Sequence, residues 1–291
     1  MIRKAVIPAA GFGTRFLPAT KAQPKEMLPV VDTPVIQYVV TEAVRSGITD
    51  IIIVIGRGKR AIEEHFDRSL ELEMQLQESG KTAQLQSIRE ISEMADIHFV
   101  WQREMRGLGD AVYCARHHVG DESFAVLLGD TIIESATDRP ITRQLADIHD
   151  AREDAPVIAL QEVPREHVSR YGIAKGTVSE DGVMELTDLI EKPSIEEAPS
   201  NLAVSARYIL TPEIFGFIAE TKRGKNNEIQ LTDAIRSLLQ TRSAYGLQFK
   251  GNRYDVGNKT DFITTNIDFA LRHPEMREEL AAYIRQLAPT L

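Results

Sequence analysis

The sequence predicts an α/β protein built on a mostly parallel, Rossmann-like sheet that is flanked by helices. The first observation is a set of short, continuous apolar runs rich in β-branched residues, such as residues 51–55, which are typical of strands buried on both faces. The second is that segments with apolar residues at helical spacing separate these runs. Such alternation gives parallel strands in one sheet with helices against both faces.

The first strand-helix-strand unit occupies the N-terminal part of the chain. We predict a buried strand over residues 3–10, which leads into a glycine-bearing loop. Thr33 and Pro34 predict the N-cap and the first turn of a helix, and Gly47 predicts the end of that helix. The apolar run at residues 51–55 is then the second strand of the unit.

The same alternation continues through the following hundred residues. We expect strand, helix, strand, helix and strand, in that order, over residues 98–101, 109–117, 124–128, 141–151 and 157–160.

Two segments depart from this pattern. Residues 64–93 are charged, rich in Glu and Gln and free of proline, which predicts two exposed helices that cap the sheet. Between residues 164 and 210 the chain has short strands and turns, as at residues 171–175 and 185–190. This second segment predicts a small antiparallel insertion.

The C-terminal part of the chain reads as helix. A helical pattern starts at Lys259, breaks near His273 and Pro274, and continues as a polar amphipathic tail. We therefore predict a main domain over residues 1–258 and a C-terminal helical extension over residues 259–291. A tail of this kind often packs on a partner subunit, so we expect a homo-oligomer.

Composition excludes several classes of protein. The chain has 291 residues, 43% hydrophobic and 26% charged, which is typical of a globular protein. Its formal charge of -9 disfavours a nucleic-acid partner, although a small anion needs only a few well-placed cations. Cys114 is the single cysteine, so neither an intrachain disulfide nor a thiolate zinc cluster forms, which fits a reducing cytoplasm. No apolar stretch is long enough to predict a membrane span or a secretory signal.

The loop that follows the first predicted strand is a candidate phosphate site. It reads Gly-Phe-Gly-Thr-Arg at residues 11–15, and backbone N–H groups at such a sheet edge bind anions. A dinucleotide fingerprint would require a third glycine where Phe16 stands and an acid where Gly56 stands, and a Walker loop is absent too. Taken alone, the loop is about equally consistent with a phosphate site and with a structural turn between strand and helix.

The residues after this loop strengthen the phosphate interpretation. Prolines at positions 18, 24 and 29 stiffen the segment, which places Arg15 and Lys25 beside the same strand edge. Two cations can then face one polyphosphate.

Two carboxylates are candidate metal ligands. Asp130 ends a hydrophobic strand, and Asp255 lies far along the chain in a second strand-to-turn context. Oxygen ligands of this kind suit Mg²⁺, although in isolation each residue is more often a cap or turn residue. No Asp-x-Asp occurs, which argues against a glycosyltransferase, and neither a histidine metal motif nor a Gly-x-Ser-x-Gly elbow is present.

These motifs together resemble the sugar nucleotidyltransferase family, in particular the bacterial UTP-glucose-1-phosphate uridylyltransferases. The resemblance begins with Pro-Ala-Ala-Gly-Phe-Gly-Thr-Arg-Phe-Leu-Pro at residues 8–18 and runs almost end to end. It continues through residues 56–60, Gln102 with residues 107–109, and residues 191–193, 227–233 and 254–257. Related thymidylyltransferases usually have Gly-Gly where this chain has Ala10 and Gly11, which favours uracil as the base.

The resemblance implies a nucleotidyltransferase fold and an activity. The expected reaction transfers a uridylyl group from UTP to α-D-glucose 1-phosphate by direct in-line attack, with Mg²⁺ as cofactor and pyrophosphate as the second product. No general base is required, because a sugar phosphate is already ionised near neutral pH. Family members assemble as dimers or tetramers.

The resemblance also implies roles for individual residues. The base is held by Gln102, whose amide both donates and accepts hydrogen bonds, and by the backbone of Ala10 and Gly107. The family usually has histidine where this chain has Asp110, so that position is left without a role. The other implied roles are phosphate contact at Gly11 and Gly13, nucleotide contact at Glu26, sugar contact at Gly172 and Glu191, charge stabilisation by Arg15, Lys25 and Lys192, and Mg²⁺ binding by Asp130 and Asp255.

Two alternatives remain open at this stage. One is a catalytically silent regulatory subunit that binds sugar nucleotides, although both candidate metal ligands and Lys192 are present. The other is the same reaction with dTTP or with another hexose 1-phosphate.

Overall fold

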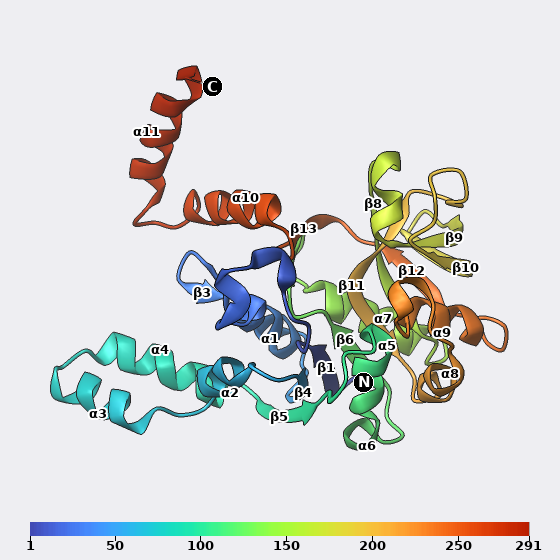
Figure 1. Ribbon diagram of the computed structural model, residues 1–291, viewed down its shortest axis with the longest axis horizontal. Coiled ribbons are helices and arrows are strands. Elements are labelled where there is room, and N and C mark those ends of the chain that lie inside the picture. The colour runs from blue at the N-terminus through green and yellow to red at the C-terminus, as the bar shows by residue number, and fades with distance from the viewer. Residues whose placement is uncertain (291) are drawn as a thin grey trace.

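A nine-stranded sheet runs through the middle of the molecule in the computed structural model, which describes residues 1–290 (Figure 1). The strands lie in the order β5-β4-β1-β6-β11-β8-β12-β10-β9. Their bounds are β1 (Lys4–Pro8), β4 (Asp50–Ile55), β5 (Asp96–Trp101), β6 (Phe124–Leu127), β8 (Val157–Glu162), β9 (Gly172–Val178), β10 (Val183–Glu191), β11 (Leu202–Leu210) and β12 (Tyr245–Gln248).

The sheet is parallel at one end and antiparallel at the other. Strands β5, β4, β1 and β6 pair in parallel, as the sequence predicts. Strand β11 is antiparallel to both β6 and β8, and β10 is antiparallel to both β12 and β9. The predicted antiparallel insertion is therefore not a separate unit: β9 and β10 extend the main sheet, which makes it mixed. Burial does not distinguish the two directions, since the antiparallel strand β11 is buried at every residue, as strands of parallel sheets are.

Side-chain alternation along β1 divides the core into two layers. Ala5 and Ile7 point to one face, where helices α1, α2 and α7 pack. Val6 points to the other face and packs with apolar residues of α5, α8 and α9. The helices are α1 (Val35–Arg45), α2 (Arg60–Phe66), α3 (Leu70–Glu78), α4 (Thr82–Glu93), α5 (Leu108–Cys114), α6 (Arg116–Val119), α7 (Ile141–Ala151), α8 (Ile214–Glu220), α9 (Leu231–Leu238), α10 (Lys259–Ala270) and α11 (Arg277–Leu287).

Helix α1 begins later than the sequence predicts. Thr33 and Pro34 form the short strand β3 (Thr33–Pro34), which pairs with β2 (Pro29–Val30), so the predicted N-cap at Thr33 is wrong. Pro34 has an extended ψ of 141° and takes the N-cap position itself. The end of the helix is as predicted, because Gly47 adopts a φ of 87° just past the last turn.

The remaining helix predictions are confirmed with small changes. The predicted helix over residues 109–117 is interrupted at Ala115 and becomes α5 and α6. Helix α7 has the predicted bounds.

The segment at residues 64–93 is helical and exposed, as predicted. It caps the sheet only where its end nearest the sheet packs against the core. Helices α3 and α4 form a hairpin that extends outward beyond the β5 edge (Figure 1). Ile91, near the end of α4, packs against the core. The hairpin is held together by Glu73, whose carboxylate accepts hydrogen bonds from Arg68 and Arg89.

The C-terminal extension is helical and breaks where the sequence predicts. Helix α10 packs on β13 (Gly251–Asp255), which pairs with β7 (Thr131–Ser135) in a separate two-stranded sheet. Helix α11 stands away from the body of the molecule and has no buried residue (Figure 1). Among the described residues, no helix is long and apolar enough to cross a membrane.

A buried ion pair joins helix α1 to the sheet. The Arg207 side chain is 0% exposed, and its guanidinium donates to Glu42 Oε2 at 3.0 and 2.7 Å. It also donates to the carbonyl of Thr131, the residue after Asp130, at 2.9 Å. Thr142 completes the network by donating from its hydroxyl to Glu42 Oε1 at 2.7 Å. The pair therefore fixes the turn that carries a candidate metal ligand.

We expect Glu42→Ala to lower the free energy of unfolding by about 3–5 kcal/mol, because it leaves the buried Arg207 charge uncompensated. Denaturant unfolding of both proteins measures the difference. Glu64→Ala is the matched control, since Glu64 forms only an exposed pair with Arg60 and its loss is expected to cost less than about 1 kcal/mol. A similar small cost for Glu42→Ala would contradict the assigned role.

Candidate active site

Four of the predicted site residues lie at the carboxyl ends of the parallel strands. Ala10 and Gly11 follow β1, Gln102 follows β5, and Asp130 follows β6. Parallel strands bring these ends to the same edge of the sheet, which is where α/β proteins bind ligands.

A cavity of about 290 Å³, the first cavity, lies at this edge of the sheet. Seven of the residues that the sequence singles out line this cavity. They come from three strand ends and the loops that follow them. Its lining residues are Pro8, Ala10, Gly11, Lys25, Glu26, Gln102, Met105, Gly107, Leu108, Ala111, Leu128, Asp130 and Glu228.

The loop at residues 11–15 is not followed by an α-helix. Short 3₁₀ turns, η1 (Thr14–Phe16), η2 (Ala19–Lys21) and η3 (Lys25–Met27), occupy the next segment, so no long helix dipole points at the loop. Gly13 has a φ of 65°, and a Cβ there would lie 3.1 Å from Lys25 Cβ. A glycine is therefore required for the loop to fold back on Lys25. Gly13 does not line the first cavity but shapes the loop beside it.

A network of opposite charges crosses the floor of the first cavity. Lys25 Nζ forms an ion pair with Asp130 Oδ2, and Lys59 Nζ donates to Glu26 Oε2 at 2.7 Å. Burial acts to lower the pKa of Lys25, but the carboxylates of Asp130 and Glu26 outweigh it and raise that pKa above its usual range. Burial also raises the pKa of Glu26. Lys25 therefore stays charged, and Glu26 is a buried partner of Lys59 at the cavity wall.

A second cavity, of about 280 Å³, adjoins the first. The two share Leu108, Leu128, Asp130 and Glu228. The second cavity contains the remaining charged residues that the sequence predicts, namely Arg15, Glu191, Lys192 and Asp255, together with Gly172.

The wall of the second cavity is formed by the paired ends of β9 and β10. Gly172 pairs with Glu191, and a Cβ on Gly172 would lie 3.0 Å from Thr232 Oγ1 and 3.2 Å from Glu191 Oε2. Close protein neighbours thus account for this glycine. Lys192 follows β10 with a φ of 45°, and its N–H donates to the carbonyl of Tyr171 at 2.9 Å. Its Nζ lies 3.1 Å from Glu191 Oε1.

Asp130 and Asp255 converge on one small space. A Cβ on Gly257 would lie 3.3 Å from Asp130 Oδ2 and 2.9 Å from Asp255 Oδ1, and glycine leaves that space open. Burial, with the nearby Asp130 charge, raises the pKa of Asp255 above its ordinary value. Lys25 outweighs the burial of Asp130 and lowers its pKa. Two oxygen donors whose charges repel fit a hard divalent cation such as Mg²⁺.

Gln102 is placed differently from the sequence-based expectation. The side chain is 4% exposed, and its Nε2 donates to Asp110 Oδ2 at 2.8 Å and to the carbonyl of Gly107 at 3.2 Å. Both amide hydrogens are therefore used inside the protein. In this arrangement only the carbonyl oxygen of Gln102 is left to face a base, whereas the sequence-based expectation has the amide both donate and accept.

Sequence reasoning missed several residues of the site. Lys59 and Glu228 lie in motifs that the resemblance includes, but neither is singled out by the sequence. Lys59 reaches the site through its ion pair with Glu26, and Glu228 lines both cavities. The signal for Asp110 was its departure from the usual histidine. Gly107 and Gly109 both pack against Ile229, since a Cβ on either would lie within 3.0 Å of the Ile229 carbonyl oxygen.

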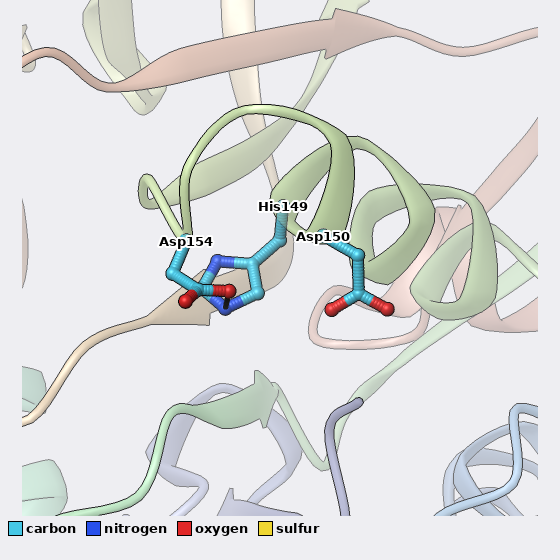
Figure 2. A group of neighbouring side chains, drawn as sticks. All are labelled: His149, Asp150 and Asp154. Carbon is cyan, nitrogen blue, oxygen red and sulfur yellow. Dashed lines mark ion pairs between the residues drawn. The ribbon is translucent and has the colours of Figure 1, made fainter.

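Other features lie away from these cavities. His149, Asp150 and Asp154 form a cluster at the end of α7 (Figure 2). His149 Nδ1 lies 2.7 Å from the carbonyl of Ala155, and Asp150 pairs with the Met1 ammonium at 3.2 Å. These local contacts explain the cluster. A cavity of about 800 Å³ lies beside β7 and β13, and none of the predicted site residues lines it.

The strand order, the glycine-bearing loop and the converging carboxylates are typical of a nucleotide-binding transferase. The chain belongs to the nucleotidyl transferase family, whose model matches residues 4–270. The family membership expected from the sequence is thus confirmed.

Particular members of this family are similar over nearly the whole chain. The UTP--glucose-1-phosphate uridylyltransferase of Bacillus subtilis (strain 168) is 51% identical over 286 residues, which are 98% of this chain and 97% of the relative. A solved UDP-glucose pyrophosphorylase complexed with UDP-glucose is 44% identical with a TM-score of 0.87, over 94% of this chain and 100% of that chain. A UTP-bound UGPase from Acinetobacter baumannii is 38% identical with a TM-score of 0.90, over 99% of this chain and 100% of that chain.

Proposed function

We propose that this protein transfers the uridylyl group of UTP to α-D-glucose 1-phosphate, giving UDP-glucose and pyrophosphate. The observation that carries the proposal is the junction of the first and second cavities at Asp130. Two phosphorylated ligands can meet there, beside the carboxylate pair and within reach of Arg15, Lys25 and Lys192. The names of the similar proteins support the same substrates.

In the proposed reaction the chain's own residues bind and orient two anions. The sugar phosphate oxygen forms a bond to the α-phosphorus as the bond to pyrophosphate breaks, and no protein group need remove a proton. The three cations offset the repulsion between the anions and the charge that develops on the departing pyrophosphate. Asp130 and Asp255 would hold Mg²⁺, which neutralises phosphate charge when it is bound.

The proposal is tested by pyrophosphate release from the purified protein with Mg²⁺, glucose 1-phosphate and, in parallel, UTP, dTTP, ATP, CTP or GTP. Release with UTP alone is the expected result. Release with dTTP instead would keep the reaction class and change the base. No release with any nucleotide or sugar phosphate, combined with binding of UDP-glucose, would favour a regulatory subunit.

We also propose that the protein is a homo-oligomer, either a dimer or a tetramer, that forms through helix α11. Tyr283 and Leu287 on α11 are 58% and 40% exposed, and Met276 at its N-cap is 40% exposed, so this helix leaves apolar surface uncovered where it stands away from the body. Tyr283 and Leu287 are four residues apart and share one face of the helix.

We expect the double variant Tyr283→Glu with Leu287→Glu to be monomeric, because charges on this face oppose its burial. Light scattering coupled to size exclusion gives the mass of each protein. Arg285→Glu, on the opposite face, should leave the mass of the assembly unchanged. An unchanged mass in the double variant would place the interface elsewhere.

A cytoplasmic location accompanies the proposed reaction, because nucleoside triphosphates are cytoplasmic substrates. The single cysteine, Cys114, is free and half-buried, which is compatible with a reducing compartment.

A further inference from the structure

The hydrogen-bonding direction of one buried amide is fixed by its neighbours. Gln102 lies at the end of β5, where its N–H donates to the carbonyl of Ile55 at 2.8 Å. Its side-chain Nε2 has two acceptors, Asp110 Oδ2 at 2.8 Å and the Gly107 carbonyl at 3.2 Å. A carboxylate and a carbonyl only accept hydrogen bonds, so the NH₂ group of Gln102 must face them.

Asp110 is itself held in place. The side chain is buried at the start of α5, and its second oxygen, Oδ1, lies 3.2 Å from Arg106 Nε. One oxygen therefore binds the arginine and the other binds the amide of Gln102. Rotation of the amide would place Oε1 of Gln102 against a carboxylate and a carbonyl, which costs two hydrogen bonds and adds repulsion.

The consequence is that Gln102 presents only an acceptor to the first cavity. Within the described chain, no group donates to its Oε1, and the residue lines that cavity. Uracil carries a donor at N3, between two carbonyl groups, whereas cytosine carries an acceptor at N3. A fixed acceptor opposite N3 is complementary to uracil, and it would face the N3 acceptor of cytosine.

We propose that Asp110 is a positioning residue for base recognition, which locks the Gln102 amide so that the site selects a pyrimidine with an N3–H donor over cytosine. The inference rests on the proposed function in one respect: it takes a pyrimidine nucleotide as the ligand. Asp110 does not touch the base and acts through Gln102.

The test is the ratio of the affinities for UTP and CTP, measured by titration calorimetry on the full chain in Mg²⁺ without glucose 1-phosphate. The wild-type protein is expected to bind UTP more tightly by about a hundredfold. Asparagine at position 110 can donate, so Asp110→Asn allows the Gln102 amide to rotate. The ratio should then fall by about tenfold or more.

The control is Glu104→Gln, which makes the same chemical change, from a carboxylate to an amide, in the loop that precedes α5. Glu104 also pairs with Arg106, at 3.7 Å, but it is 71% exposed, and the side-chain amide of Gln102 donates to Asp110 and Gly107 rather than to Glu104. Its ratio is expected to match the wild type. Asp110→Ala removes the acceptor without adding a donor and gives the same test if the asparagine variant does not fold.

A double-mutant cycle separates positioning from a general structural role. If Asp110 acts through Gln102, then Asp110→Asn has no further effect on the ratio in a Gln102→Ala background. The proposal is overturned by an equal drop in that background, by a wild-type ratio in Asp110→Asn, or by equal wild-type affinities for UTP and CTP. Selective UTP binding without pyrophosphate release would instead refute the transfer reaction and leave this inference standing.

Discussion

Lys192→Ala is expected to lower kcat by about a hundred- to a thousandfold, the usual cost of removing one electrostatic stabiliser. The residue lines the second cavity with Arg15 and Asp255, at the place where the two phosphorylated ligands are proposed to meet. Steady-state pyrophosphate release at saturating UTP and glucose 1-phosphate measures the effect.

The matched control for this variant is Lys175→Ala. Lys175 lies on β9, in the same part of the sheet, but its side chain is exposed. Its removal should leave kcat within about twofold of the wild type, because a surface charge far from the reacting atoms is screened. Turnover near the wild-type value in Lys192→Ala would remove the residue from the catalytic mechanism.

Asp130→Asn and Asp255→Asn are both expected to raise the Mg²⁺ concentration that gives half-maximal activity, by at least about tenfold, because each removes one carboxylate ligand. A magnesium titration of pyrophosphate release measures the shift. Asp121→Asn, at an exposed position, is the control.

Using both variants separates two roles of Asp130. Asp130 is the ion-pair partner of Lys25 as well as a candidate ligand, whereas Asp255 has no ion pair with a described lysine. A shifted magnesium titration in both variants supports the metal pair. A lower kcat with an unchanged titration, seen only in Asp130→Asn, would show that Asp130 serves Lys25 instead.

The sequence by itself determined the local helices and strands and most of the residues that form the site. Continuous apolar runs predicted β1, β4, β5 and β6, and apolar residues at helical spacing predicted α7, because burial on two faces of a strand or on one face of a helix leaves a pattern in the residue order. Twelve of the thirteen predicted site residues line one of the two adjoining cavities, and Gly13 shapes the loop beside them. Their motifs are contiguous, so they can be recognised without knowledge of the fold.

The tertiary structure alone decided which of these elements and residues meet. Strand direction at β11, the pairing of Glu26 with Lys59 and the burial of Glu42 against Arg207 each join positions far apart in the chain. The direction of the Gln102 amide also depends on packing, since α5 brings the Asp110 acceptor to it although the two residues are only eight positions apart. Hydrogen bonds and ion pairs between distant residues leave no periodic trace in the sequence, and that is why residue type alone could not assign Asp110.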